Sequence, residues 1–358
     1  MNKRLTVPAG KRALAAATLV AALVGSLFVT AAPAGAATGT IVFVSDHNVW
    51  IMPADDPSAA RPVTTDGTAD APYVAPTADD RGAILAVRGG ERGEIVRMDQ
   101  NGTLLGAPFR PALTGNISDM DLAPDGVVFS YTHYESYSSP EGFVVAPTLD
   151  FAYADGSDSS AVANPMFDDL DATFYSATQA VLPGDIEESG DSSFPTVATY
   201  TLGDADKQTW FRLCDTSEDF EDWCYPLYAD VTDAQDRLVV SLEGGTWVPV
   251  GPRLRVFTMS APAPAEPARS CELVGPEPGI VDDFGFWNPS WSPDGSALVY
   301  ELNAAFADSP QPAGAGIYLA SGFDADCAQA FAGTQLVVPG GSQPDWSAAP
   351  LGATPPGP

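Results

Sequence analysis

Aspartates recur at one position of a repeated turn-and-strand pattern in this chain, and matched carboxylates are groups that a cation can use. The pattern is clearest at 288–302, NPSWSPDGSALVYEL, where a short strand meets a Pro-Asp-Gly turn and then an apolar strand. The residue before the Trp of this pattern can be compared between the copies, and we call this equivalent position one level of the repeat. In order from the first copy, that level holds Asp345, Tyr73, Asp121, Asp169, Asp230 and Ser290.

Four aspartates at one level repel one another if the copies surround a common axis. At about 8 Å and an effective dielectric near 20, each ionised pair repels by roughly 2 kcal/mol. A hard cation relieves such repulsion, and calcium accepts oxygen-only ligation of flexible geometry. We therefore predict that calcium, or else magnesium, binds Asp121, Asp169, Asp230 and Asp345. The alternative is that these side chains spread apart or lie at a wet mouth where water screens them, and no cofactor is certain.

Catalytic motifs are scarce by comparison. The chain has no Gly-x-Ser-x-Gly nucleophile elbow, and its two histidines are His47 and His133. Glu135 follows His133 closely, but neither a nucleophile nor an orienting partner is identified for that histidine. Acidic residues are so abundant that no pair of them indicates glycoside hydrolysis. The sequence favours a non-catalytic binding role, and the alternative is an extracellular hydrolase or lyase with a site assembled from several loops.

Aromatic residues gather in the longer connections between strands in the later repeats. Aromatic side chains on loops bury a large area at small entropic cost when a partner binds. We expect a site for a protein or glycan partner that includes Tyr134, Trp223, Trp247 and Trp287. The alternative is that several of these side chains pack down over the strands.

The repeat predicts the architecture that positions these residues. Copies recur about every fifty residues, which is in the range of propellers and solenoids. Each copy offers four strands rich in β-branched and aromatic residues, without a helical period. Six copies predict an all-β fold, a six-bladed β-propeller of four-stranded antiparallel blades. The first strand, 41–44, lacks an inner neighbour, and SQPDWSAAP near the C-terminus supplies it, so we expect this strand to close the ring on the first blade.

The Pro-x-Trp-Ser-Pro-Asp-Gly turn at 289–295, followed by the Ile-Tyr strand at 316–320, resembles the repeat of the TolB-like propellers, also called WD40-like. The pattern is partly kept at 343–347 and is degenerate in the other copies. The resemblance implies a six-bladed propeller, which agrees with the count of repeats. Propellers of that family bind partner proteins or accompany a hydrolase domain, and neither role transfers residue by residue.

The N-terminal segment is typical of an export signal. Basic residues precede an acid-free apolar run, 13–29, and Ala34-Gly35-Ala36 follows it. We expect residues 1–36 to be a signal peptide, 37–350 the propeller and 351–358 a flexible tail, the mature protein being secreted, monomeric and not inserted in a membrane. The alternative is that the apolar run stays as an anchor.

Charge excludes nucleic acid as a partner. Removal of residues 1–36 takes away four of the 16 basic residues and none of the 47 acidic ones, which moves the formal net charge from −31 to about −35. Binding to phosphates needs a basic face that releases counterions, and only Lys207 remains among the lysines. The acidity suits solubility outside the cell.

Four cysteines in an exported chain favour disulfides over a metal or redox site. No CxxC pair is present. We predict that Cys214 pairs with Cys224 inside one short loop, and that Cys271 pairs with Cys327 on the outer parts of consecutive blades.

Overall fold

The computed structural model describes most of the chain beyond the N-terminal segment. The described residues are 38–111, 115–139, 142–157, 171–189, 192–213, 224–244, 250–273, 284–304, 311–323 and 327–355. The chain separates into two units, 1–33 and 34–358, and every described residue belongs to the second. The predicted signal cleavage after Ala36 therefore falls outside the described residues and stays a prediction.

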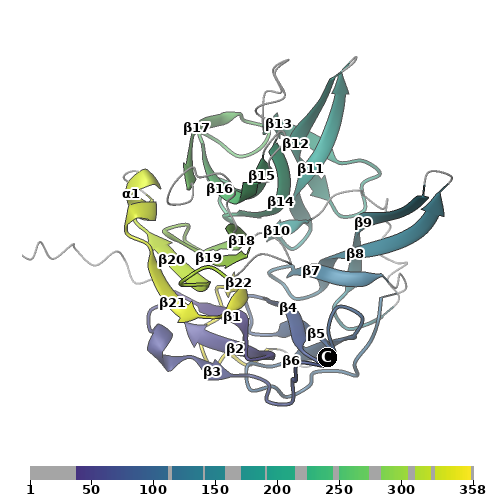
Figure 1. The fold of residues 1–358 in the computed structure, drawn as a ribbon, viewed down its shortest axis with the longest axis vertical. Helices are drawn as coiled ribbons and strands as arrows, with labels where there is room; N and C mark the ends of the chain where they lie inside the picture. The colour runs from purple at the N-terminus through teal and green to yellow at the C-terminus, as the bar shows by residue number, and fades with distance from the viewer. Residues whose placement is uncertain are drawn as a thin grey trace, which may run out of the picture. The chain divides into compact units, whose positions relative to one another are not determined.

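Six antiparallel sheets are arranged around a common centre (Figure 1), which confirms the predicted all-β, six-bladed propeller. Blade 1 consists of β22 (Ser342–Ser347), β1 (Thr40–Ser45), β2 (Asn48–Pro53) and β3 (Arg61–Pro62). Blade 2 consists of β4 (Tyr73–Ala78), β5 (Ile84–Arg88) and β6 (Glu94–Met98). Blade 3 consists of β7 (Asn116–Leu122), β8 (Val128–Ser139) and β9 (Gly142–Tyr153).

The remaining blades each have four strands. Blade 4 consists of β10 (Thr173–Ser176), β11 (Gln179–Ser189), β12 (Ser192–Thr201) and β13 (Gln208–Arg212). Blade 5 consists of β14 (Cys224–Val231), β15 (Arg237–Gly244), β16 (Val250–Met259) and β17 (Pro267–Leu273). Blade 6 consists of β18 (Phe284–Trp291), β19 (Ala297–Ala304), β20 (Gly316–Ser321) and β21 (Gln335–Pro339). The helical elements of the described residues are η1 (Pro57–Ala59) and α1 (Cys327–Ala332).

Blades 2 and 3 show three strands each within the described residues, where four were expected. In blade 2, isolated bridges from Ile95 to Phe109 and from Met98 to Leu104 take the place of a regular outer strand. In blade 3, the residues that follow β9, 158–170, lie outside the described part of the chain.

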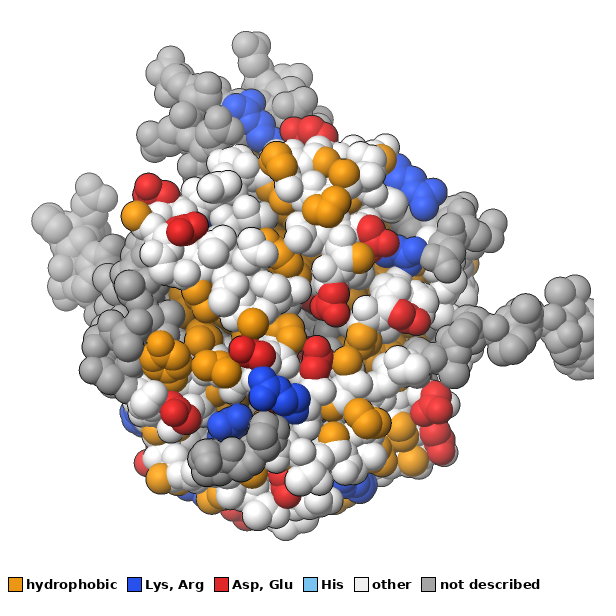
Figure 2. Space-filling view, turned by 180° about the vertical axis from the view of Figure 1, so that it is seen from behind, with side chains coloured by type: hydrophobic (Ala, Val, Ile, Leu, Met, Phe, Trp, Pro, Cys, Tyr) orange, Lys and Arg blue, Asp and Glu red, His pale blue; other side chains and the backbone are white. Residues whose placement is uncertain are grey.

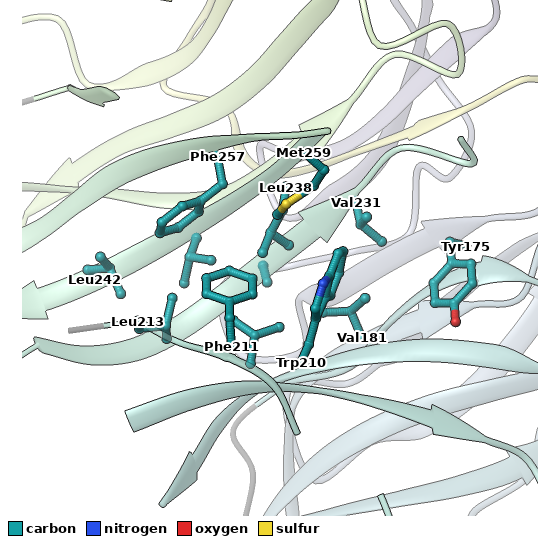
Figure 3. Packing of buried hydrophobic residues seen from close by; sticks show 13 residues of the cluster. Tyr175, Val181, Trp210, Phe211, Leu213, Val231, Leu238, Leu242, Phe257 and Met259 are labelled. Carbon is teal, nitrogen blue, oxygen red and sulfur yellow. The ribbon is translucent and has the colours of Figure 1, made fainter. Parts of the chain in front are cut away.

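The hydrophobic core lies between the blades. One cluster joins blade 4 to blade 5, with Trp210 and Phe211 of β13 facing Phe257 and Met259 of β16 (Figure 3). Equivalent clusters join each of the other neighbouring pairs. Because each blade is covered on both faces, the middle strands of a blade bury apolar side chains toward both neighbours, and burial of each large side chain contributes about 1.5–3 kcal/mol.

The C-terminal strand β22 pairs with β1, in agreement with the predicted closure of the ring. Ile41 lies opposite Trp346, and Val42 lies opposite Asp345. Ile41 and Trp346 also belong to a buried cluster with Val299 of blade 6. The two ends of the folded unit thus share one sheet that packs against the last blade, which leaves the inner edge of β1 covered.

The residues after β22 contact blade 2. Gly352 N donates to Gln100 Oε1 (2.6 Å), and Gln100 Nε2 donates to the carbonyl of Pro350 (3.1 Å). These bonds hold the first part of the segment that we expected to be a flexible tail.

Cys271 of β17 is disulfide-bonded. Helix α1, which begins at Cys327, packs against β17. The side chains of Cys224 and Cys327 and all of Cys214 fall outside the described residues, so both pairings stay predictions.

No helix in the described part of the chain is long and apolar enough to cross a membrane.

Candidate functional site

The innermost strand of every blade faces the central channel, and one level of it alternates carboxyl and hydroxyl side chains. In blade order, this level holds Asp345, Thr77, Asp121, Thr173, Asp230 and Ser290. All of them except Thr77 line both of two adjoining cavities, one toward each end of the channel. This level is therefore the waist of the channel.

The structure places three of the four predicted aspartates at this waist and corrects the alignment elsewhere. Thr77 occupies the blade 2 position that the sequence alignment assigned to Tyr73, whose hydroxyl instead donates to Asp66 (2.8 Å). A bulge between Val74 and Thr77 displaces the register there. In blade 4 the waist position belongs to Thr173, and Asp169 lies outside the described residues.

Each waist carboxylate accepts a backbone N–H from the next blade. Ala78 N donates to Asp345 Oδ2 (2.8 Å), and Phe174 N donates to Asp121 Oδ2 (2.6 Å). Trp291 N donates to Asp230 in the same way. The waist therefore ties blade 1 to 2, 3 to 4 and 5 to 6.

The hydroxyl groups at the waist join the remaining pairs of neighbouring blades, which are 2 and 3, 4 and 5, and 6 and 1. Leu122 N donates to Thr77 Oγ1 and Trp346 N to Ser290 Oγ, each at 3.0 Å. Thr173 Oγ1 is itself a donor, to Asp230 Oδ1 (2.9 Å). Together with the carboxylates, these bonds form a continuous ring of contacts around the channel, and they satisfy backbone donors that are buried there.

Burial raises the pKa of the waist carboxyls. Burial raises the pKa of Asp230 to about 7 and that of Asp345 to about 6. The hydrogen bonds that these carboxylates accept lower both pKa values, but by less than burial raises them. The pKa of Asp121 is well above its usual range, first through burial and then through the neighbouring Asp345 carboxylate. Neighbouring carboxylates add to the rise for Asp121 and Asp230, and protonation reduces the repulsion between such groups.

The predicted cation has no preformed ligand set among the described residues. There, no three His, Cys, Asp or Glu side chains lie close enough together to hold a metal ion. N–H and hydroxyl donors point at the carboxylates instead. Calcium therefore stays a prediction of the sequence.

A second level of polar side chains lies two residues before the waist, at one mouth of the channel. Here Asp119 donates a hydrogen bond to Asp171, and the pKa of Asp119 is raised well above its usual range, chiefly by burial and next by Asp171. Asp171 Oδ2 also accepts Ala229 N (2.7 Å). Tyr228, Asn288 and Gln343 line the same cavity, about 460 Å³ of space partly open to solvent.

The backbone at this mouth is strained in three blades. Ala75, Asn288 and Gln343 have φ of 47°, 46° and 51°, and each precedes a proline. Left-handed conformations of residues other than glycine cost about 1–3 kcal/mol each and cluster at functional sites. The strain directs these strands around the cavity, with Asn288 Nδ2 and Gln343 N both donating to the buried carboxylate of Glu301 (2.9 and 2.8 Å).

Two of the four predicted aromatic residues lie near this mouth. The rings of Trp287 and Tyr228 make an edge contact at 6.1 Å between centroids. Tyr134, which is 37% exposed, is close enough to Tyr228 to contribute to the raised pKa of that phenol, whose main cause is burial. Trp223 and Trp247 lie outside the described residues.

Sequence reasoning missed Asp119, Asp171 and Tyr228. The signal was available, because side chains two residues apart on a strand point to the same face. Each of the three lies two residues before a waist position, as do Asn288 and Gln343.

The other end of the channel is lined by the turns that follow the inner strands, among them Asp80, Asp233 and Thr232. Figure 2 shows one face of the molecule, on which acidic side chains stand around a hollow near the middle. Burial raises the pKa values of Asp80 and Asp233.

Comparison with known proteins supports the fold. No protein-family model matches the sequence, and no related curated protein is found. Among solved structures, the chain is similar to TolB from Acinetobacter baumannii, with 16% identity and a TM-score of 0.52 over 87% of this chain and 67% of that one. It is less similar to a prolyl endopeptidase, with 12% identity and a TM-score of 0.41 over 71% of this chain and 34% of that one. The β-propeller domain of Cps50 (Swd1) from Myceliophteria thermophila matches at 11% identity, with a TM-score of 0.39 over 78% of this chain and 96% of that domain.

The six sheets and the similarity to TolB define the fold of the molecule as a six-bladed β-propeller.

Proposed function

We propose that this chain is a secreted, non-catalytic β-propeller that binds a protein or glycan partner at the channel mouth formed by blades 3, 5 and 6. The observation that supports this role is the aromatic group of Tyr134, Tyr228 and Trp287 beside the mouth cavity. Aromatic anchors beside a pocket and surrounded by polar groups are the usual centre of a binding site.

The long hairpins of blades 3 and 4 favour the same end of the channel. Strands β8 and β9 have 12 residues each, and β11 has 11, whereas β5 of blade 2 has five. Asn116 at the start of β7 lies opposite Tyr134 of β8, so the hairpin continues beyond the inner strand at the mouth. Figure 1 shows both hairpins projecting from the ring. Such projections enlarge the surface that a partner contacts.

The partner-binding role can be tested by capture from culture supernatant with the immobilised mature protein. Trp287→Ala and Tyr134→Ala should each lose the captured partner while keeping the thermal midpoint of the parent. Val127→Ala serves as the matched control, because Val127 is 47% exposed and lies in the turn at the other end of β7. Equal capture by all three variants would remove the mouth from consideration.

Secretion rests on the basic, apolar and small-residue series of the N-terminal segment. Intact-mass analysis of protein from the supernatant should show a chain that begins at Ala37. A mass that includes Met1 to Ala36 would indicate a retained anchor instead.

A second candidate function is an extracellular hydrolase or lyase, favoured by the hydrogen-bonded Asp119 and Asp171 at the mouth. Two carboxyl groups that share a proton can act as acid and base. The test is release of reducing ends from a panel of neutral polysaccharides. Activity that disappears in Asp119→Asn and in Asp171→Asn, but persists in Asp70→Asn on the exposed surface, would support the enzyme. Absence of any release by the parent protein would reject it for these substrates.

A further inference from the structure

A groove lies between blades 4 and 5, near the ends of the strands farthest from the mouth cavity. It contains about 660 Å³ of space, part of it open to solvent. Asp171, before β10, lines the mouth, whereas Tyr175, near the end of β10, lines the groove. The two cavities are therefore separate.

One wall of the groove is the polar continuation of a buried sheet face. Val197 of β12 belongs to the core between the two blades, and Thr199 and Thr201 follow it at intervals of two residues, so all three point to the same face. On β11, Gln179 precedes the buried Val181 in the same way. The face thus changes from aliphatic to hydroxyl and amide groups as it leaves the core.

The other wall is the loop between β16 and β17, which contributes Pro262 and Pro264. Two hydrogen bonds hold this loop. Trp210 Nε1 donates across the blade boundary to the carbonyl of Ala265 (2.8 Å), and Ala263 N donates to Gln235 Oε1 (3.2 Å). The groove is therefore preorganised, which lowers the entropic cost of binding.

Tyr175 forms part of the floor and is only 8% exposed. Its ring stands at one edge of the buried cluster (Figure 3). Its hydroxyl has no hydrogen-bond partner among the described residues, and burial alone raises the pKa of this phenol. The hydroxyl oxygen itself reaches the solvent in the groove, so it is able to bond a ligand that enters there.

We propose that this groove binds a neutral sugar residue. Amide and hydroxyl side chains offer donors and acceptors together, which is what a sugar hydroxyl needs. The rings of Pro262 and Pro264 suit the apolar faces of a pyranose, and the buried indole of Trp210 supports the loop that carries them. No Lys or Arg is among the described residues that line the groove, and Asp204 and Asp206 at its rim disfavour an anion. Both carboxylates are exposed, so salt screens their attraction for a cation.

This sugar site is independent of the proposed partner site at the mouth, because the two lie toward opposite ends of the blades. Trp287→Ala should therefore leave sugar binding unchanged. Failure of one proposal does not affect the other.

Isothermal titration calorimetry of the mature protein with maltotriose, cellotriose and triacetylchitotriose tests the site. At least one trisaccharide should bind saturably. Tyr175→Phe removes only the hydroxyl, and it should weaken binding by about 3- to 10-fold without lowering the thermal midpoint. Tyr318→Phe, which removes a hydroxyl bonded to the carbonyl of Gly314 on blade 6, is the matched control.

If Tyr175→Phe does not fold, Thr199→Val is the second test, because it removes a hydroxyl from the wall of the groove; it should also weaken trisaccharide binding. Retention of full affinity in whichever of these two variants folds would overturn the proposal. So would the absence of saturable binding for all three trisaccharides at millimolar concentration.

Discussion

Thr173 donates its hydroxyl hydrogen to Asp230 across the boundary between blades 4 and 5, with 2.9 Å between Oγ1 and Oδ1. The other oxygen of Asp230 accepts the backbone N–H of Trp291 in blade 6. One buried carboxyl therefore joins three consecutive blades at the channel. Equivalent bonds from Asp121 and Asp345 make the waist a continuous support for the ring.

Substitution of Asp230 separates its role as an acceptor from its charge. Asp230→Leu leaves Trp291 N–H without an acceptor and should lower the free energy of unfolding by about 1–3 kcal/mol. Asp230→Asn keeps an acceptor oxygen and should cost less. Urea unfolding measures both, with Asp70→Leu on the exposed surface as the control. Equal losses for Leu and Asn would show that the hydrogen bond is not what matters.

The raised pKa values make the fold more stable at lower pH. Burial raises the pKa of Asp230 from 3.8 to about 7 and that of Asp345 from 3.8 to about 6. A carboxyl with a higher pKa in the folded chain contributes stability that is complete below its unfolded pKa and is lost as pH rises through the folded value. The free energy of unfolding should therefore fall between about pH 4 and about pH 7.

Surface repulsion in this acidic chain acts in the same direction as the buried carboxyls. The comparison is therefore with the double variant Asp230→Asn and Asp345→Asn, whose stability should depend less on pH over that interval. If the free energy of unfolding changes with pH equally in the parent and the double variant, surface repulsion and not the two buried carboxyls causes the change.

The calcium prediction has a direct test in thermal melting with calcium and with a chelator. A calcium ion that neutralises Asp121, Asp230 and Asp345 should raise the midpoint, and the triple Asn variant should lose the increase. Identical midpoints, with no metal by elemental analysis, would leave hydrogen bonding and protonation as the only relief of the waist carboxylates.

Two C-terminal deletions test the closure of the ring. Loss of residues 343–358 removes β22, uncovers the edge of β1 and takes Trp346 from the cluster shared with blade 6. It should lower the thermal midpoint far more than loss of 351–358, which removes the Gly352 bond to Gln100 and costs about 1 kcal/mol. Similar midpoints for the two deletions would contradict closure through β22.

A peptide map of secreted protein under non-reducing conditions tests the cysteine pairing. We expect fragments that join Cys271 to Cys327 and Cys214 to Cys224, since α1 packs against the strand that carries Cys271. A bond from Cys271 to Cys214 or Cys224 would refute this connectivity.

The sequence by itself determined most of the strands, the turns and the number of blades. Alternation of apolar residues and Pro-Asp-Gly turns are local signals, and their recurrence in NPSWSPDG, LAPDG and the shorter QPDWS is visible without a structure. The expected pairing of the C-terminal strand with 41–44 also followed from counting strands, and β22 pairs with β1 as that count required.

The tertiary structure alone decided which side chains meet at the waist and the mouth. A bulge in β4 puts Thr77 where the alignment put Tyr73, and a displacement of that kind depends on packing against neighbouring blades. The raised pKa values of Asp119 and Asp230 require burial, which no spacing of aspartates reveals. The groove beside Tyr175 has one wall from blade 4 and one from blade 5, so it exists only once the two sheets have packed together.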